Sequence, residues 1–305
     1  MKKIEVLKKP VFWLVLILGL LGAAIWQLPD RQLHLVFCDV GQGDAILIYQ
    51  GTTQILVDGG PSQRVLNCLS NHLPFWDRTV EMVILTHPQA DHFTGLIDVI
   101  ERYSVKQFVV NSIANDSEGF WEFYQAVIAE EAKIYSPKAG DKIRLGPIQF
   151  LVLWPKEKLG SELVWQNSHL RGEPGSISGH LGGETLGAAT YSGDLNESSI
   201  VLKLSFGNFD ALLTGDISTK IDGQLDLSDI EVLKVAHHGS KYSTGEEFLK
   251  QVEPELAVIS VGKNRFGHPT NEVIERIREL GISILRTDEE GEIEVVSDGK
   301  SWYTQ

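Results

Sequence analysis

The hydrophobic pattern of the chain changes character near residue 30. Residues 11–28 read VFWLVLILGLLGAAIWQL and carry no charge. From residue 32 onward, short β-rich runs such as QLHLVFCDV, DAILIYQ and TQILVDGG alternate with helical stretches. The alternation predicts one layered α/β body over residues 31–305. Residues 1–30 form a separate segment before it.

The expected elements of the body follow from this alternation. Gly51 predicts a hairpin between the second and third strands. Helices are expected near 62–72, 91–103 and 118–131, with strands at 80–87 and 105–110. After the apolar run IQFLVLWP, a Gly/Ser-rich tract over 156–194 is too long and polar for a packed element, so it predicts an exposed insertion. Strands and helices then resume and end in a terminal strand pair.

The charge-free stretch predicts a membrane anchor. Four lysines precede it, and the polar residues PDRQ follow it. At a rise of about 1.5 Å per residue the stretch would be about 27 Å long, enough for a bilayer core. The lysines predict a cytoplasmic amino terminus, and therefore a body outside the cytoplasm. A cleaved signal peptide, with Gly22, Ala23 and Ala24 near its end, is the alternative.

The formal net charge of the chain is −14. Such a balance argues against a surface that holds polyanions by charge alone, so any nucleic-acid contact must be local. Carboxylates around a bound metal count less toward repulsion, because the ion reverses the local field. Cys38 and Cys68 are the only cysteines. Buried free thiols are expected, and a bridge between them is the alternative in an oxidising compartment.

Side chains that commonly bind metal ions follow three apolar runs. His87, Asp91 and His92 lie in THPQADH where a strand ends and a helix begins. Asp216 ends the run ALLTGD, and the pair HH at 237–238 ends IEVLKVAHH. A layered sheet would bring these strand ends together, and imidazoles with carboxylates are the ligands that transition metals prefer. The pattern therefore predicts a metal centre.

At these residues the sequence resembles the metallo-β-lactamase superfamily, and within it the ComEC/Rec2 DNA-uptake type. The resemblance covers nearly all of residues 32–297. It rests on the strings DVGQGDA, ILVDGG, LTHPQADHFTG, NESSIVLKLSFGNFDALLTGD, VLKVAHHGSKYS and ISVGKNRFGHP. The resemblance implies a four-layer αββα sandwich with a metal centre at one edge of its two sheets.

By the same resemblance, each ligand position is assigned by motif. His87, Asp91 and His92 would form the first metal loop, Asp216 the bridging carboxylate and His237 the late ligand, with His238 either a further ligand or a hydrogen-bonding neighbour. The superfamily usually has histidines where this chain has Gln89 and, later, Asn196 or Ser199. One firmly held ion and one labile ion are therefore expected. Mn²⁺ or Mg²⁺ is favoured over a tightly held Zn²⁺ pair.

The resemblance implies a metal-dependent hydrolase in which the ion activates water and polarises a phosphoryl oxygen. Asp91 or Asp216 would orient the water. Three cations, Lys241, Lys263 and Arg265, are candidates to neutralise a phosphodiester, and His268 or His238 to protonate the leaving oxygen. The expected activity is a nuclease or phosphodiesterase on DNA, anchored to the membrane beside a competence channel protein.

Two other functions remain open. One is hydrolysis of another ester or amide, such as a lactone, a β-lactam or a cell-wall component. The other is a non-catalytic module that keeps the fold and one structural metal. Gln89 and Asn196 stand where the superfamily usually has histidines, which disfavours the hypothesis of a zinc β-lactamase. The set of potential metal ligands argues against a purely structural role.

Overall fold

The computed structural model describes residues 10–19, 30–159 and 193–305. The chain divides into two compact units, Met1–Arg31 and Gln32–Gln305. In the first unit residues 10–19 are helical. No helix among the described residues is long and apolar enough to cross a membrane. Residues 20–28 of the expected anchor, and 160–192 of the expected insertion, lie outside the described residues.

The second unit contains two large sheets. The first sheet has the strand order β17-β16-β1-β2-β3-β5-β7-β8, and the second has the order β15-β14-β13-β12-β11-β10-β9. The strands of the first sheet are β1 (Leu33–Phe37), β2 (Ile46–Gln50), β3 (Thr53–Val57), β5 (Met82–Leu85), β7 (Gln107–Val110), β8 (Lys133–Tyr135), β16 (Ile293–Ser297) and β17 (Trp302–Thr304). Those of the second are β9 (Lys142–Leu145), β10 (Ile148–Trp154), β11 (Val201–Phe206), β12 (Phe209–Leu213), β13 (Val232–Lys234), β14 (Leu256–Ile259) and β15 (Ser283–Arg286).

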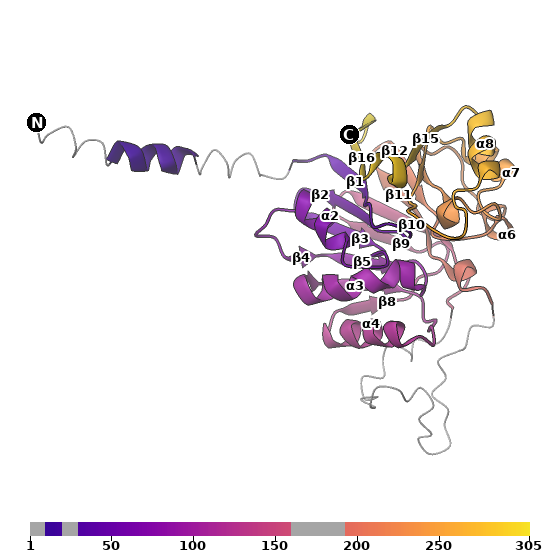
Figure 1. Cartoon of the computed structure of the whole chain (residues 1–305), viewed down its shortest axis with the longest axis horizontal. Coiled ribbons are helices and arrows are strands. Elements are labelled where there is room, and N and C mark those ends of the chain that lie inside the picture. Colours follow the sequence, from indigo (N-terminus) through magenta and orange to yellow (C-terminus); the bar gives the residue numbers. More distant parts are fainter. Residues whose placement is uncertain (1–9, 20–29, 160–192) are drawn as a thin grey trace, which may run out of the picture. The chain divides into compact units, whose positions relative to one another are not determined.

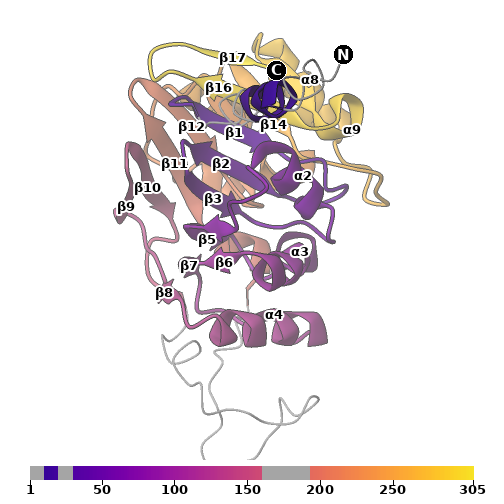
Figure 2. The ribbon, with the colours of Figure 1, turned by 90° about the vertical axis from the view of Figure 1, so that its left-hand side faces the viewer.

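Helices cover the outer faces of the sheets. The helices α2 (Val65–His72), α3 (Ala90–Arg102) and α4 (Glu118–Ala129) lie along the first sheet (Figures 1 and 2). The second sheet is covered by α6 (Thr219–Asp222), α7 (Glu246–Val252) and α8 (Asn271–Glu279). The remaining elements are β4 (Thr79–Val80) paired with β6 (Ser104–Val105), α9 (Thr287–Glu290), and the 3-10 turns η1 (Leu195–Ser198) and η2 (Ala236–Gly239). The αββα sandwich that the resemblance implied is confirmed.

Alternation of side chains within the strands explains the layering. In β1, Leu33, Leu35 and Phe37 point into the core between the two sheets, whereas Val36 packs among residues of α2 and α3. Successive side chains of a strand point to opposite faces, so a strand that is apolar at every position is buried on both sides. This explains the nearly continuous apolar runs of the central strands.

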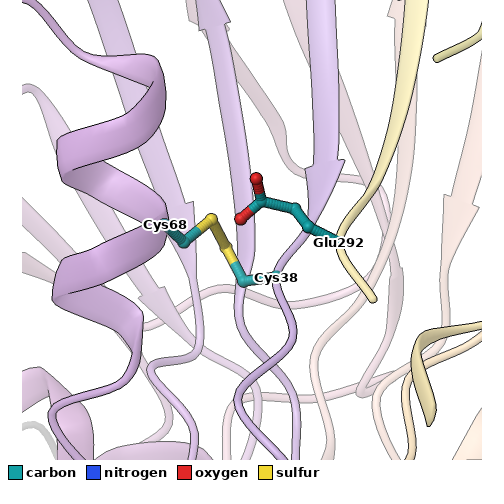
Figure 3. A group of neighbouring side chains, drawn as sticks. All are labelled: Cys38, Cys68 and Glu292. Atoms are coloured by element: carbon teal, nitrogen blue, oxygen red, sulfur yellow. A yellow bond between two sulfur atoms is a disulfide. The ribbon is translucent and has the colours of Figure 1, made fainter. Parts of the chain in front are cut away.

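Cys38 and Cys68 form a disulfide that joins the end of β1 to α2 (Figure 3). The expectation of free thiols is therefore wrong, and the bridged alternative is the state in the structure. The two Cα atoms are 5.7 Å apart, which lies within the range that a disulfide spans. Glu292 lies beside the bridge. The group is no metal site in this state, because bonded sulfurs offer no thiolate.

Candidate metal centre

The predicted ligands converge at the carboxyl ends of the central strands. His87, Asp91 and His92 follow β5, Asp216 follows β12, and His238 follows β13. Potential ligand atoms of His87, His92 and Asp216 lie within 4.8 Å of one another, and so do those of Asp91, His92 and His238. The chain thus brings together, in one buried cluster, side chains that lie far apart in sequence.

One oxygen of Asp216 is the centre of this cluster. Its Oδ2 atom lies 3.3 Å from Nε2 of His92 and 3.3 Å from Nε2 of His238. The same His238 nitrogen lies 3.5 Å from Oδ2 of Asp91. Asp216, His92 and His238 are buried, whereas the side chain of Asp91 is 29% exposed. Asp91 therefore gives the cluster its contact with solvent.

The imidazoles are oriented as metal ligands. His238 donates its Nδ1–H to the carbonyl oxygen of Ser260 at 2.9 Å, and His92 Nδ1 lies 2.8 Å from Oδ2 of Asp58. Each contact turns the Nε2 atom toward the cluster. Second partners of this kind fix the tautomer and ring orientation of ligand histidines. Asp58 thus supports the loop that carries the ligands, since it also accepts hydrogen bonds from the amide and hydroxyl groups of Thr86.

His87 is oriented by a chain of hydroxyl groups. Thr86 donates its hydroxyl proton to Asp58 at 2.7 Å, so its oxygen can only accept from His87 Nδ1 at 3.0 Å. Ser199 likewise donates to the carbonyl oxygen of Asn196 and lies 3.3 Å from the same nitrogen. Nδ1 of His87 therefore carries the proton, and Nε2 presents a lone pair.

The Nε2 atoms of His87, His92 and His238 are buried, and none makes a hydrogen bond of good geometry. Those of the last two have only ion-pair contacts to the carboxylates of Asp91 and Asp216. That of His87 has no hydrogen-bond partner among the described residues. A buried polar atom without a partner is costly, and native proteins rarely retain one without a ligand, ion or water. The residues present therefore fit a divalent cation, with Asp91, Asp216 and the three imidazoles as the donors.

The pKa values describe how the cluster balances its charge without an ion. Burial lowers the pKa of His87 well below its ordinary value, so the imidazole is neutral. Burial acts in the same direction on His238, but the carboxylates of Asp216 and Asp44 raise its pKa to about 10. Burial alone would raise the pKa of Asp216, yet the positive charges of His238, His92 and Lys234 hold it well below its usual range. A metal ion would displace the proton from His238.

Sequence reasoning missed one residue of the centre, the buried Lys234 at the end of β13. Its ammonium group donates to the carbonyl oxygen of Gly215 at 2.7 Å, lies 3.2 Å from Oδ1 of Asp216 and is ion-paired with Asp44. All three protons of the ammonium group are thereby directed to oxygen. A lysine inside the otherwise apolar run VLKVA was the signal that could have identified it, since lysine is almost never buried unless it is paired.

The structure distinguishes the two adjacent histidines. β13 ends at Lys234, and His237 and His238 lie in the turn η2 with φ values of 50° and 53°, in the left-handed region. Such backbone strain in residues other than glycine is typical of functional sites. The turn directs His238 into the cluster, whereas the ring of His237 lies 5.4 Å from that of His268. Of the described residues, His238 and not His237 joins the potential ligand groups.

The other predicted residues lie in the loops that follow β5, β13 and β14. His268 is half-buried beside His237, and burial together with His237 and His238 lowers its pKa. A neutral imidazole accepts a proton more readily than it supplies one, so this position does not favour the expected role of His268 as an acid. Lys241 is exposed, with Nζ 5.0 Å from the ring centroid of Tyr242. Gln89 ends the loop before α3 as its N-cap.

Comparison with known proteins agrees with this geometry. The sequence model described as the metallo-beta-lactamase superfamily matches residues 38–263. The chain is 30% identical over 224 residues to ComE operon protein 3 of Bacillus subtilis (strain 168), covering 71% of this chain and 24% of that protein. It is 29% identical over 264 residues to Recombination protein 2 of Haemophilus influenzae, covering 84% of this chain and 28% of that protein. The chain thus spans about a quarter of the length of these curated relatives.

The fold is also found in solved structures. The metallo-beta-lactamase fold protein YhfI from Bacillus subtilis aligns with a TM-score of 0.52 at 13% identity, covering 86% of this chain and 99% of that protein. At this level of identity the likeness concerns the fold alone.

Proposed function

Because this chain belongs to the metallo-β-lactamase superfamily and is of the ComEC/Rec2 type, we propose that it is a metal-dependent phosphodiesterase that cleaves DNA. The observation that carries this proposal is the convergence of three buried Nε2 atoms, none of them in a hydrogen bond of good geometry, on the carboxylates of Asp91 and Asp216. The similarity to competence proteins favours DNA over other esters. The alternatives are hydrolysis of a lactone, a β-lactam or a cell-wall component, and a module that binds metal without catalysis.

Each residue of the centre has a separable task in this reaction. His87, His92, His238, Asp91 and Asp216 would hold the ion, which supplies Lewis acidity toward a phosphoryl oxygen and lowers the pKa of water. Asp91, the partly exposed carboxylate, lies where a water molecule can reach it and donate a hydrogen bond to it. The ammonium of Lys234 holds Oδ1 of Asp216, so that Oδ2 remains directed at the two imidazoles.

The donor set also bears on the choice of ion. With His238 included, three nitrogens and two carboxylates face the centre, which suits Mn²⁺ or Zn²⁺ better than Mg²⁺. A second ion would draw on His87, on the carboxylate of Asp216 and on few further donors. Asn196 lies in the motif where the superfamily usually has the later histidine, and its buried Oδ1 has no hydrogen-bond partner. The proposal is therefore one firmly held ion and one labile ion.

We propose further that the catalytic body works outside the cytoplasm, tethered by residues 11–28 and beside a channel protein that conducts DNA. The Cys38–Cys68 disulfide supports this location, because such bonds persist in oxidising compartments. Protease added to spheroplasts or protoplasts with an intact cytoplasmic membrane should degrade the body of the full chain. Resistance to protease until the cytoplasmic membrane is lysed would contradict this location.

The activity is tested with the full chain and four substrates. With Mn²⁺ it should cleave single-stranded DNA and bis(p-nitrophenyl) phosphate, and Asp91→Ala should abolish both activities. Asp98→Ala, on the same helix but outside the centre, is the matched control and should retain them. Hydrolysis of nitrocefin or a lactone with DNA left intact would favour the second function. No activity on any substrate by metal-loaded protein would favour the non-catalytic module.

A further inference from the structure

Two loops beside the metal centre differ in charge from the rest of the chain. They follow the adjacent parallel strands β13 and β14 and comprise residues 236–245 and 260–270. Neither loop contains an Asp or a Glu, although the chain has 41 acidic residues. Together they carry three exposed cations, Lys241, Lys263 and Arg265. This local excess of positive charge is complementary to a polyanion in a protein whose overall charge is −14.

The two loops are joined to each other and to the centre. The amide of Thr270 donates to the carbonyl oxygen of Gly239 at 2.9 Å. From the second loop, Ser260 accepts the hydrogen bond that orients His238. The rings of His237 and His268 lie 5.4 Å apart across the loops. A ligand that contacts both loops is therefore held next to the metal ligands.

Each loop also exposes one large aromatic ring. Phe266 is 72% exposed and Tyr242 is 67% exposed. By contrast, the aromatic run FWEFY at 120–124 packs largely into the core. Exposed aromatic side chains near a site are typical of ligand contact, because the apolar ring gains most when a ligand covers it.

Hydrogen bonds fix the backbone from which both rings project. Oδ1 of Asn264 accepts hydrogen bonds from the amides of Phe266 at 2.9 Å and His268 at 3.1 Å. The Nδ2 group of Asn264 donates to the carbonyl oxygens of Gly262 and His268. In the other loop, the carbonyl oxygen of Tyr242 accepts from the amide of Thr219 at 2.9 Å. Binding therefore requires little ordering of the loops.

We infer that Phe266 and Tyr242 stack on unpaired bases of a single DNA strand, while Lys241, Lys263 and Arg265 contact its phosphates. This inference rests on the proposed function and names the form of DNA that the centre receives. Bases in a duplex are already stacked and offer no free face, whereas each unpaired base does. The loops would therefore select single-stranded over duplex DNA without reading its sequence.

The test measures binding separately from cleavage. The full chain is titrated onto a fluorescent single-stranded oligothymidylate in EDTA, so that no hydrolysis occurs, and anisotropy is recorded. Phe266→Ala and Tyr242→Ala should each weaken binding by about 5- to 100-fold, the range for loss of one stacked base. Phe266→Trp should retain binding. Phe75→Ala is the control, because Phe75 is 75% exposed but precedes β5 at the opposite strand end.

A second arm separates stacking from charge. An abasic strand of the same length should bind the wild type more weakly than oligothymidylate does, and Phe266→Ala should leave its binding unchanged. Equal binding of both strands, or equal affinity of the Ala variants and the wild type, would overturn the inference. Failure of the proposed function gives a different result. If binding in EDTA depends on the two aromatic residues but no DNA is cleaved with Mn²⁺, the proposed hydrolysis is refuted and the binding inference stands.

Discussion

The Nε2 atom of His238 lies 3.3 Å from Oδ2 of Asp216. This contact identifies His238 as the candidate metal ligand that follows β13, whereas the sequence favoured His237. His238→Ala should therefore weaken Mn²⁺ binding by roughly 100-fold or more, because it removes a donor and not only a supporting contact. Isothermal titration measures the loss. His237→Ala is the matched control and should stay within about threefold of the wild type. If His237→Ala weakened Mn²⁺ binding more than His238→Ala does, His237 would be the ligand.

Removal of the buried Lys234 should destabilise the fold. Lys234→Met leaves Asp44 and Asp216 buried without their cation, and breaking a buried pair costs about 3–5 kcal/mol of unfolding free energy. Urea unfolding of metal-free protein measures the change. Lys203→Met breaks the partly exposed pair with Asp210 and should cost about 1 kcal/mol or less. Equal losses for the two variants would show that Lys234 does not neutralise the centre.

The Cys38–Cys68 bond should contribute measurably to stability. It closes a loop with a sequence separation of 30, and the chain-entropy argument gives about 3–4 kcal/mol for a loop of that size. Cys38→Ser with Cys68→Ser should therefore lower the melting temperature by several degrees. The wild type in reducing agent should show a similar loss. An unchanged melting temperature in both cases would mean that the thiols are not bridged in the protein.

A carboxylate far from the metal centre sets a pH dependence of stability. Although burial acts against ionisation, the hydrogen bond from His34 and the charge of His72 hold the pKa of Glu294 below its ordinary value. The ionised form therefore stabilises the fold above the ordinary, unfolded pKa of about 4.5. That contribution is lost as the pH falls through the lowered folded pKa.

Glu294→Gln tests this pH dependence. At pH 7 the substitution should cost roughly 1–3 kcal/mol, since it removes the charge that His34 contacts at 2.6 Å. The difference from the wild type should shrink as the pH approaches the folded pKa of Glu294. Urea unfolding at pH 7 and at about pH 4 measures both values. A difference that does not change with pH would contradict the assignment.

Much of the centre could be predicted from the sequence because its residues directly follow apolar strands. His87 and Asp216 follow the ends of β5 and β12, Asp91 and His92 lie at the start of the helix that follows β5, and parallel strands place their carboxyl ends at one edge. The choice between His237 and His238 could not be predicted in this way. It depends on two consecutive left-handed residues, which turn adjacent side chains in different directions. No periodic pattern encodes such a turn.

Contacts between residues that are distant in sequence could not be predicted either. The pairing of Cys38 with Cys68 depends on the packing of α2 against the end of β1. Lys234 was overlooked because its two partners come from other elements. Asp44 lies between β1 and β2 of the first sheet, and Asp216 follows β12 of the second. In both cases the signal is a contact distant in sequence, which only the folded chain brings together.

The central claim is that this cluster of imidazoles and carboxylates binds a divalent ion. Metal content and Mn²⁺ titration of the full chain test it directly, with Asp91→Ala beside the wild type and Asp98→Ala as the control. The wild type and Asp98→Ala should each bind at least one ion per chain, and Asp91→Ala should bind it far more weakly. A wild type that binds no Mn²⁺ or Zn²⁺, or an Asp91→Ala protein that binds it equally well, would contradict the account.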